Sequence, residues 1–392
     1  MSMRPFLQRS TQAVRSVHTS GTKAVYGWGH THALPLKFDE ERDDAYTTPT
    51  RLDTLSDYAI DNSEAVSHIA AGWAHSLIGT QSQVYGFGLN RSGQLGHGPD
   101  TLVTMSLGKA NLKQLACGRE HSHIVTEEQN STSLYSFGNS MYGQLGIGKS
   151  KYTRPGTLSL EEFPVKVEGY QGAVTDIACG LDHTIFSTDH NSLYAMGWGS
   201  DGQLGLAPTF TGDKDVPSLL PRLGDSKIKL LSGSTDFTLM LTEDNVLWTW
   251  GNSEYGQGMQ GKKIDRITEP IKVPVKGVKD IAAGGPFSVI LTEDGRVHSC
   301  GYGALGHGKD TIESLVLREI EGLKDVERVF ATTDYAAAIT ASGELFTWGL
   351  NGPSGRLGLD SVDHAFVPKR VDIDRPVTEL ALGTNHVLAL CD

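Results

Sequence analysis

The chain has little of what most covalent or metal chemistry requires. Its 392 residues include only four cysteines, Cys117, Cys179, Cys300 and Cys391, and no two of them form a C-x-x-C pair. This spacing gives no support to a structural zinc site, a redox motif or a disulfide framework. No apolar run approaches the roughly 20 residues that span a bilayer. The composition therefore predicts a soluble, folded protein of a reducing compartment with no transmembrane segment.

Basic residues are also in deficit. The chain carries 34 Lys and Arg against 46 Asp and Glu, which gives a formal net charge of −12. A surface with this balance does not favour nonspecific attraction to nucleic acid or to anionic lipid. We therefore expect a protein partner and no direct nucleic-acid binding.

The first 22 residues depart from this acidic balance. They contain Arg4, Arg9 and Arg15 and no acidic residue, and their apolar residues fall on one stripe of a helical wheel. An amphipathic, Arg-rich, acid-free segment is typical of an organellar transit peptide, whereas a secretory signal needs an uninterrupted apolar core. We predict a mitochondrial presequence over 1–20 and a mature domain over 21–392, located in the matrix or peripherally on the matrix face of the inner membrane. The alternative is a basic tail that carries no targeting signal.

Glycine, by contrast, is abundant and regularly placed. Many of the 46 glycines recur at fixed offsets, and the segment V-Y-G-W-G at 25–29 returns in seven versions about 50 residues apart. The closing glycines of these versions are Gly29, Gly88, Gly138, Gly197, Gly251, Gly301 and Gly349. Self-similarity at a fixed period is the signature of a repeat architecture.

Other blocks share this period. Most versions continue into a glycine-rich loop such as 139–148, and then a Pro-containing β-branched stretch such as 163–167. A block of the A-C-G-L-D-H type, such as 177–188, completes the repeat. Each repeat thus supplies four short runs rich in β-branched and aromatic residues, separated by glycine turns, which predicts a four-stranded antiparallel sheet.

Seven such sheets can bury their apolar faces only against one another. Packing around an axis covers both faces of every sheet and leaves short outer edges. We therefore predict an all-β, monomeric, seven-bladed β-propeller, in which strands from both termini share one blade and close the ring. We expect glycine beside the inner strands because crowding near the axis leaves no room for a Cβ. The long excursions at 30–47 and 207–227 are expected to be exposed loops.

The repeat resembles that of the regulator-of-chromosome-condensation family over residues 25–391. The residues that carry the resemblance are [VL]-Y-x-[FW]-G, then G-Q-L-G-x-G, then A-x-G-x-x-H-[ST]. WD and kelch repeats fit less well, because no Trp-Asp signature recurs and only one Gly-Gly pair is present. Phe287 and Tyr335 depart from the family pattern, which has His at these positions.

The resemblance to mitochondrial members implies a guanine-nucleotide exchange factor for a mitochondrial GTPase. The alternative is a noncatalytic scaffold or assembly factor for the mitochondrial ribosome or a respiratory complex. Neither needs a catalytic residue, a cofactor or a metal of its own. The sequence twice matches G-x-G-x-x-G, at 197–202 and 301–306. Both matches lead to a strand rather than to a helix, so dinucleotide binding is not expected.

Four histidines, His75, His121, His183 and His386, share one position of the repeat. A ring of imidazoles could suggest a metal site. Equivalent atoms of adjacent blades, however, lie farther apart than the roughly 4 Å that two ligands of one ion span. We expect instead that each histidine forms hydrogen bonds within the turn of its own blade.

The remaining candidates for partner binding lie in loops. One group is acidic and suits basic side chains of a partner, or could repel phosphate and disturb the magnesium site of a GTPase. The other is an insertion with a basic tip. The resemblance implies that Asp182, His183 and Asp201 match loop positions that face the GTPase in the family's exchange factor, and that the insertion corresponds to a wedge. Solvated turn acids and a tolerated surface insertion are the alternatives. The candidates are Asp182, His183, Asp201, Asp236 and Asp334, and in the insertion Lys149, Lys151 and Arg154.

Overall fold

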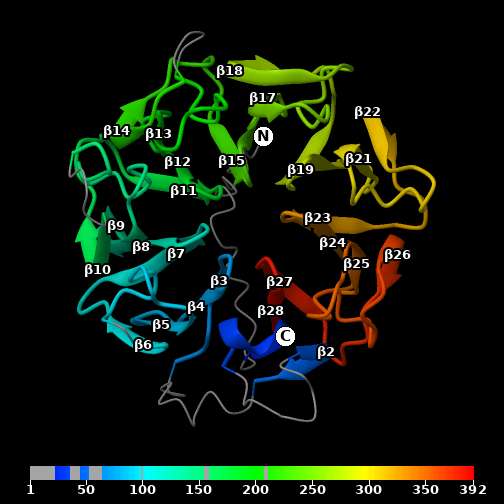
Figure 1. Ribbon diagram of the computed structural model, residues 1–392, viewed down its shortest axis with the longest axis horizontal. Coiled ribbons are helices and arrows are strands. Elements are labelled where there is room, and N and C mark those ends of the chain that lie inside the picture. Colours follow the sequence, from blue (N-terminus) through cyan, green and yellow to red (C-terminus); the bar gives the residue numbers. More distant parts are fainter. Residues whose placement is uncertain (1–22, 36–44, 53–63, 99, 154–158, 207–210) are drawn as a thin grey trace, which may run out of the picture.

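The structure, a computed structural model, describes residues 23–35, 45–52, 64–98, 100–153, 159–206 and 211–392. The predicted presequence lies outside the described residues. The described part of the chain forms 28 strands and one short 3-10 helix, η1 (Thr31–Ala33), arranged as a ring of blades around a central axis (Figure 1). Within it, no helix is long and apolar enough to cross a membrane.

Each blade is a four-stranded antiparallel sheet, as the repeat predicts. In the blade closed by both ends of the chain, the order is β2-β1-β28-β27, and in the other six blades the strands follow chain order. The strands are β1 (Ala24–His30), β2 (Ala45–Arg51), β3 (His68–Ala71), β4 (His75–Gly79), β5 (Gln83–Gly88), β6 (Leu102–Ser106), β7 (Asn111–Cys117), β8 (His121–Glu128), β9 (Ser131–Asn139), β10 (Leu160–Lys166), β11 (Val174–Cys179), β12 (His183–Thr188), β13 (Leu193–Gly197), β14 (Lys214–Leu219), β15 (Ile228–Gly233), β16 (Phe237–Thr242), β17 (Leu247–Ser253), β18 (Ile264–Lys272), β19 (Val278–Ala283), β20 (Phe287–Thr292), β21 (Val297–Tyr302), β22 (Glu313–Glu319), β23 (Val326–Ala331), β24 (Tyr335–Thr340), β25 (Leu345–Gly349), β26 (Ala365–Arg370), β27 (Val377–Leu382) and β28 (His386–Cys391).

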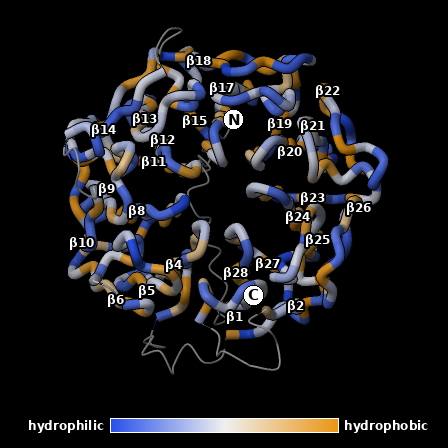
Figure 2. Tube along the Cα trace, in the orientation of Figure 1, coloured by the Kyte–Doolittle hydropathy of each residue, from blue (hydrophilic) through white to orange (hydrophobic). Residues whose placement is uncertain are grey.

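Burial follows the position of a strand within its blade. The second strands, such as β12 and β16, are buried along their whole length, because both faces meet neighbouring blades. The outermost strands are far less buried, and among them β6 is buried at every second residue. Hydrophobic segments accordingly recur in every blade around the ring (Figure 2).

The two ends of the chain close the ring as predicted. Strand β1 pairs with β28 in a register that sets Val25 opposite Leu390 and Trp28 opposite Val387. Trp28 is completely buried, and its Nε1 donates a hydrogen bond to the main-chain oxygen of Arg356 in the adjacent blade at 3.0 Å. The last blade is thus held by pairing between the termini and by packing against its neighbour.

The glycines follow two different physical rules. The crowding prediction holds beside the inner strands, where a Cβ on Gly180 would lie 2.2 Å from the main-chain oxygen of Ser234 in the next blade. A second rule applies to the seven closing glycines, which end or nearly end the third strands. Gly197, for example, has φ +103, and a Cβ there would lie 2.3 Å from the main-chain oxygen of Asp182. A left-handed backbone at a close approach requires glycine at this position.

The two long excursions are not purely loops. Residues 45–47 begin strand β2, and residues 214–219 form strand β14. Both are outer strands, and β14 has one buried residue among six. A Pro-containing β-branched stretch at 48–52 marks most of β2. The sequence did not reveal β14, because an outer strand with little burial shows little hydrophobic alternation.

Side chains also tie the inner strands of consecutive blades together. The Asp176 carboxylate accepts a hydrogen bond from the main-chain N–H of Leu231 in the next blade at 2.7 Å, and Asp280 accepts one from Val329 at 3.0 Å. These polar residues lie on the inner strands, where the central opening leaves main-chain donors that a neighbouring side chain can satisfy.

Candidate functional site

One end of the propeller carries all the predicted partner-binding positions that the structure describes. In an antiparallel blade, the turn between the first two strands and the loop between the last two leave the sheet at the same end. Asp182 and Asp236 lie in turns of the first kind, and Asp201 lies in a loop of the second kind. We call this end the loop face. The topology therefore brings these acids to one end of the ring.

Three of the acids are electrostatically coupled. Burial raises the pKa of Asp236 to about 6, with help from the negative charges of Asp201 and Asp182. Among the described residues, none donates a hydrogen bond to the Asp236 carboxylate, whereas the Trp198 Nε1 donates to Asp201 at 3.4 Å. Asp236 is thus the acid of this cluster whose oxygens remain open to a partner.

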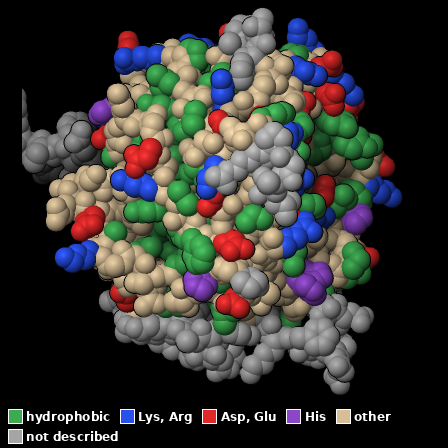
Figure 3. All heavy atoms as spheres, turned by 60° about the vertical axis from the view of Figure 1, so that its left-hand side comes forward, with side chains coloured by type: hydrophobic (Ala, Val, Ile, Leu, Met, Phe, Trp, Pro, Cys, Tyr) green, Lys and Arg blue, Asp and Glu red, His purple; other side chains and the backbone are tan. Residues whose placement is uncertain are grey.

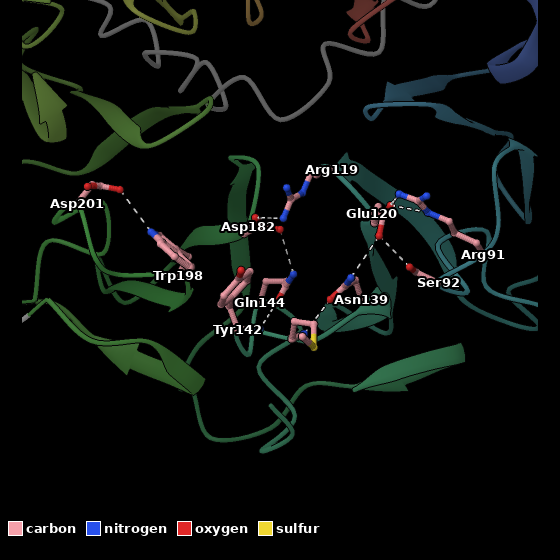
Figure 4. A network of polar contacts seen from close by, with 11 residues as sticks. Arg91, Ser92, Arg119, Glu120, Asn139, Tyr142, Gln144, Asp182, Trp198 and Asp201 are labelled. Carbon is pink, nitrogen blue, oxygen red and sulfur yellow. Dashed lines mark hydrogen bonds and ion pairs between the residues drawn. The ribbon is translucent and has the colours of Figure 1, made fainter. Parts of the chain in front are cut away.

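Asp182 already has partners within the protein. It forms an ion pair with Arg119 of the preceding blade and accepts a hydrogen bond from Gln144 Nε2 at 3.4 Å (Figure 4). Burial raises the pKa of Asp182, and the Arg119 charge acts against that rise. The carboxylate is therefore held in place between two blades rather than presented as an open charge.

Other acidic residues of the loop face are partly neutralised too. Glu120 pairs with Arg91, and Asp334 lies 3.6 Å from the buried guanidinium of Arg356. Acidic, basic and hydrophobic side chains consequently intermingle on the surface seen in Figure 3. These arginines could not be recognised from the sequence, because their acidic partners lie 22 to 63 residues away and no pattern within one repeat links them.

His183 is completely buried, so its side chain does not reach the loop face. Its Nε2 lies 3.3 Å from the hydroxyl of Thr238 in the next blade. The expectation that the repeat histidines bond within their own turn is therefore wrong for the imidazole. The turn itself is closed by the main chain, through a hydrogen bond from Gly180 N–H to the His183 oxygen at 2.9 Å.

A contact between a histidine Nε2 and a hydroxyl group of the next blade also occurs at other blade junctions. It shows which ring nitrogen carries the proton. The His75 Nε2 lies 2.9 Å from Ser122 Oγ, and that hydroxyl donates to the main-chain oxygen of Gln94 at 2.8 Å. Since the serine proton is used on a carbonyl, the His75 Nε2 must carry the proton of the first bond. Burial lowers the pKa of His75 to about 4 and that of His183 to about 3, so both are neutral at physiological pH.

One group of potential metal ligands occurs among the described residues. Ligand atoms of His121, His123 and Cys179 all lie within 4.8 Å of one another. Both imidazole Nε2 atoms, however, contact the hydroxyl of Thr184, which donates to the Gln144 oxygen and therefore takes a proton from each ring. With the Nε2 lone pairs absent and burial raising the pKa of the Cys179 thiol, the arrangement favours a hydrogen-bonded core.

The basic insertion is anchored rather than extended. Lys149 pairs with Glu161, and the Lys151 ammonium lies over the ring of Tyr142, 4.1 Å from its centre. Arg154 lies outside the described residues. Sequence reasoning missed Tyr142 and its neighbour Trp198, although aromatic residues at the same two positions of later repeats could have marked them.

Comparisons with known proteins agree with the repeat. A family model described as "Regulator of chromosome condensation (RCC1) repeat" matches residues 81–125, 133–187, 190–241 and 342–390, and a second model of that description matches 174–203, 228–257 and 278–306. A human protein named "RCC1-like G exchanging factor-like protein" is 29% identical over 85% of this chain and 77% of its own length. The Arabidopsis thaliana "RCC1 domain-containing protein RUG3, mitochondrial" is 31% identical over 88% of this chain and 79% of its own. The crystal structure of human WBSCR16 superposes with a TM-score of 0.83 at 28% identity, covering 94% of this chain and 99% of that one.

Proposed function

Because this chain belongs to the RCC1 repeat family, we propose that its loop face binds a mitochondrial GTPase and promotes release of the bound guanine nucleotide. The name of the human relative, an exchanging-factor-like protein, supports this activity, since that relative matches most of the propeller. Fold alone does not imply function, so the proposal rests on the chemistry of the loop face.

The observation that carries the proposal is the open carboxylate of Asp236. It lies half-buried near two further acids, and its pKa is raised to about 6, first by burial and then by the negative charges of Asp201 and Asp182. Nucleotide binding by a GTPase depends on Mg²⁺ bridging the phosphates and on their charge being neutralised. A negative group brought to that site repels phosphate and offers the metal a competing oxygen ligand. Both effects favour nucleotide release.

Location in mitochondria is the second part of the proposal. Its support is the Arg-rich, acid-free composition of residues 1–22 and the mitochondrial designation of the Arabidopsis relative. Fusing residues 1–22 to a fluorescent protein should direct the fusion to mitochondria. Replacing Arg4, Arg9 and Arg15 with Gln should abolish that targeting. Cytosolic fluorescence of the unaltered fusion would contradict this part.

Release of labelled GDP from purified matrix and inner-membrane GTPases tests the exchange activity. The unaltered protein should accelerate release from one of them, and Asp236→Asn should reduce the acceleration roughly ten-fold, which corresponds to about 1.4 kcal/mol from one charge. Glu243→Gln is the matched control, because it removes an exposed acid from the opposite end of the blade that carries Asp236. No acceleration with every GTPase tried would refute the exchange activity.

A noncatalytic binding function is the second candidate. The internal ion pairs of Asp182 and Asp334 favour it, because a carboxylate neutralised by its own arginine is less able to repel phosphate. This function predicts co-sedimentation with an assembly intermediate of the mitochondrial ribosome or a respiratory complex, without any effect on GDP release. Loss of the protein should then deplete that complex.

A further inference from the structure

Three aromatic side chains of the loop face surround the ammonium group of Lys151. Its Nζ lies 4.1 Å from the ring centre of Tyr142, 4.9 Å from that of Tyr152 and 5.6 Å from that of Trp198. The Tyr142 and Trp198 rings meet edge to face, with centres 4.4 Å apart, across the junction of two blades. A cation within about 6 Å of an aromatic face is attracted by the ring quadrupole. We call Tyr142, Tyr152 and Trp198 the aromatic cage.

The surroundings of the cage suit a cation better than an anion. Asp201 accepts a hydrogen bond from the Trp198 indole on the side away from Tyr142 (Figure 4). Burial raises the pKa of Asp236, and the charges of Asp201 and Asp182 add to that rise, so the acids extend from the cage across the loop face. The cage is open to partners, because the Tyr152 side chain is 65% exposed.

A second aromatic pair shows that the fold does not need a lysine at such a junction. Tyr255 and Tyr302 occupy the same two repeat positions as Tyr142 and Trp198, two blades further along the chain. Their ring centres are 5.4 Å apart, and each residue is 40% exposed. Within the described residues, no lysine or arginine lies over this pair. Packing of the two rings therefore does not require a cation, and the presence of Lys151 calls for another explanation.

We propose that the aromatic cage is a receptor for a lysine or arginine side chain of a protein partner, and that Lys151 occupies it until that side chain replaces it. The exchange keeps one positive charge in the cage in both states, so the acids nearby stay compensated. It also releases the Lys151 ammonium for contact with an acidic group of the same partner. This inference deepens the proposed function by naming the partner's chemistry, and it rests on the loop face being the partner surface.

Binding of a minimal basic probe tests the competition. The probe is the peptide acetyl-Gly-Lys-Gly-amide, titrated at constant ionic strength while the indole N–H signal of Trp198 is followed by NMR. The norleucine peptide serves as an uncharged control of the same length. Removing the resident cation with Lys151→Ala should tighten probe binding roughly five- to thirty-fold, the range expected for a cation–aromatic interaction. Lys151→Arg keeps a cation in the cage and should bind as weakly as the unaltered protein.

Two double variants separate the cage from the rest of the surface. Adding Trp198→Ala to Lys151→Ala should abolish the gain, observed through the backbone amide signals of Tyr142, whereas adding Tyr255→Ala, at the equivalent pair, should leave the gain intact. Equal binding by Lys151→Ala and the unaltered protein would overturn the proposal, as would a gain that survives loss of Trp198 or a norleucine peptide that binds equally well. The assay contains no GTPase. If the probe binds as expected but GDP release is not accelerated, the exchange activity is refuted and the aromatic cage stands. If GDP release is accelerated but the probe does not bind as expected, only the role of the cage is refuted.

Discussion

The buried repeat histidines should make this propeller sensitive to acid, and replacing one of them should remove a calculable part of that sensitivity. The change is His183→Phe. Phenylalanine occupies the same position in the next two blades, as Phe237 and Phe287, so the slot accepts an aromatic ring without nitrogen. The loss at neutral pH is one hydrogen bond of 3.3 Å to Thr238, worth about 0.5–1.5 kcal/mol and offset by the apolar ring.

The pH dependence follows from the difference between the folded and unfolded pKa. Burial lowers the pKa of His183 from 6.5 to about 3. Below pH 6.5 the unfolded chain therefore binds a proton that the folded chain does not, so stability is complete above that pH and falls as the pH drops toward 3. Between pH 7.5 and 5.0 the loss from this one residue is about 2 kcal/mol. His183→Phe should recover that amount at pH 5.0.

Urea unfolding followed by tryptophan fluorescence at pH 7.5 and 5.0 measures the effect. The stability difference between His183→Phe and the unaltered protein should shift by about 2 kcal/mol in favour of the variant on going to pH 5.0. The reciprocal change, Phe237→His, should add acid sensitivity, because Ser288 of the next blade already donates to Gln257 and can accept from a new imidazole. The reasoning is refuted if the stability difference for His183→Phe is the same, within about 0.5 kcal/mol, at both pH values.

Three further changes test the closure of the ring, its glycines and its thiols. Trp28→Ala empties a completely buried site between the blade that closes the ring and its neighbour, and should lower the free energy of unfolding by about 3–5 kcal/mol in a urea titration. Trp73→Ala is the control, and it should lower that free energy far less because Trp73 is 39% exposed. Gly197→Ala places a Cβ 2.3 Å from a main-chain oxygen at a residue with φ +103 and should lower the melting temperature. Gly169→Ala is the control, because Gly169 has φ +86 but open space around the new Cβ, so its melting temperature should fall much less. Equal decreases would contradict the close approach at Gly197. Burial raises the pKa of the Cys300 thiol from 9.0 to about 12, so iodoacetamide at pH 8 should alkylate it about a thousandfold more slowly in the folded protein than in urea. Rapid labelling of the folded protein, read by mass spectrometry, would argue against that burial.

The propeller architecture could be predicted from the sequence because each repeat independently predicts the same four-stranded blade. Strand, turn and glycine signals recur at one period, so an ambiguous copy such as that around Phe287 is read through its clearer neighbours. The blade shared by the two termini followed in the same way, since the chain begins and ends inside a repeat. The outer strand β14 was missed because a weakly buried strand lacks the alternation by which a strand is recognised.

What the sequence alone determined about this protein is therefore the seven-bladed ring and the face on which its loops gather. Only the tertiary structure decided which side chains meet on that face. Arg119 neutralises Asp182 from 63 residues away, and Lys151 lies between rings of two blades. Such contacts cross blade junctions, where each side chain meets whatever the neighbouring repeat carries at a different position. The repeat pattern specifies the residues within one repeat and gives no information about contacts between different positions of neighbouring repeats. The functional surface is composed of such contacts.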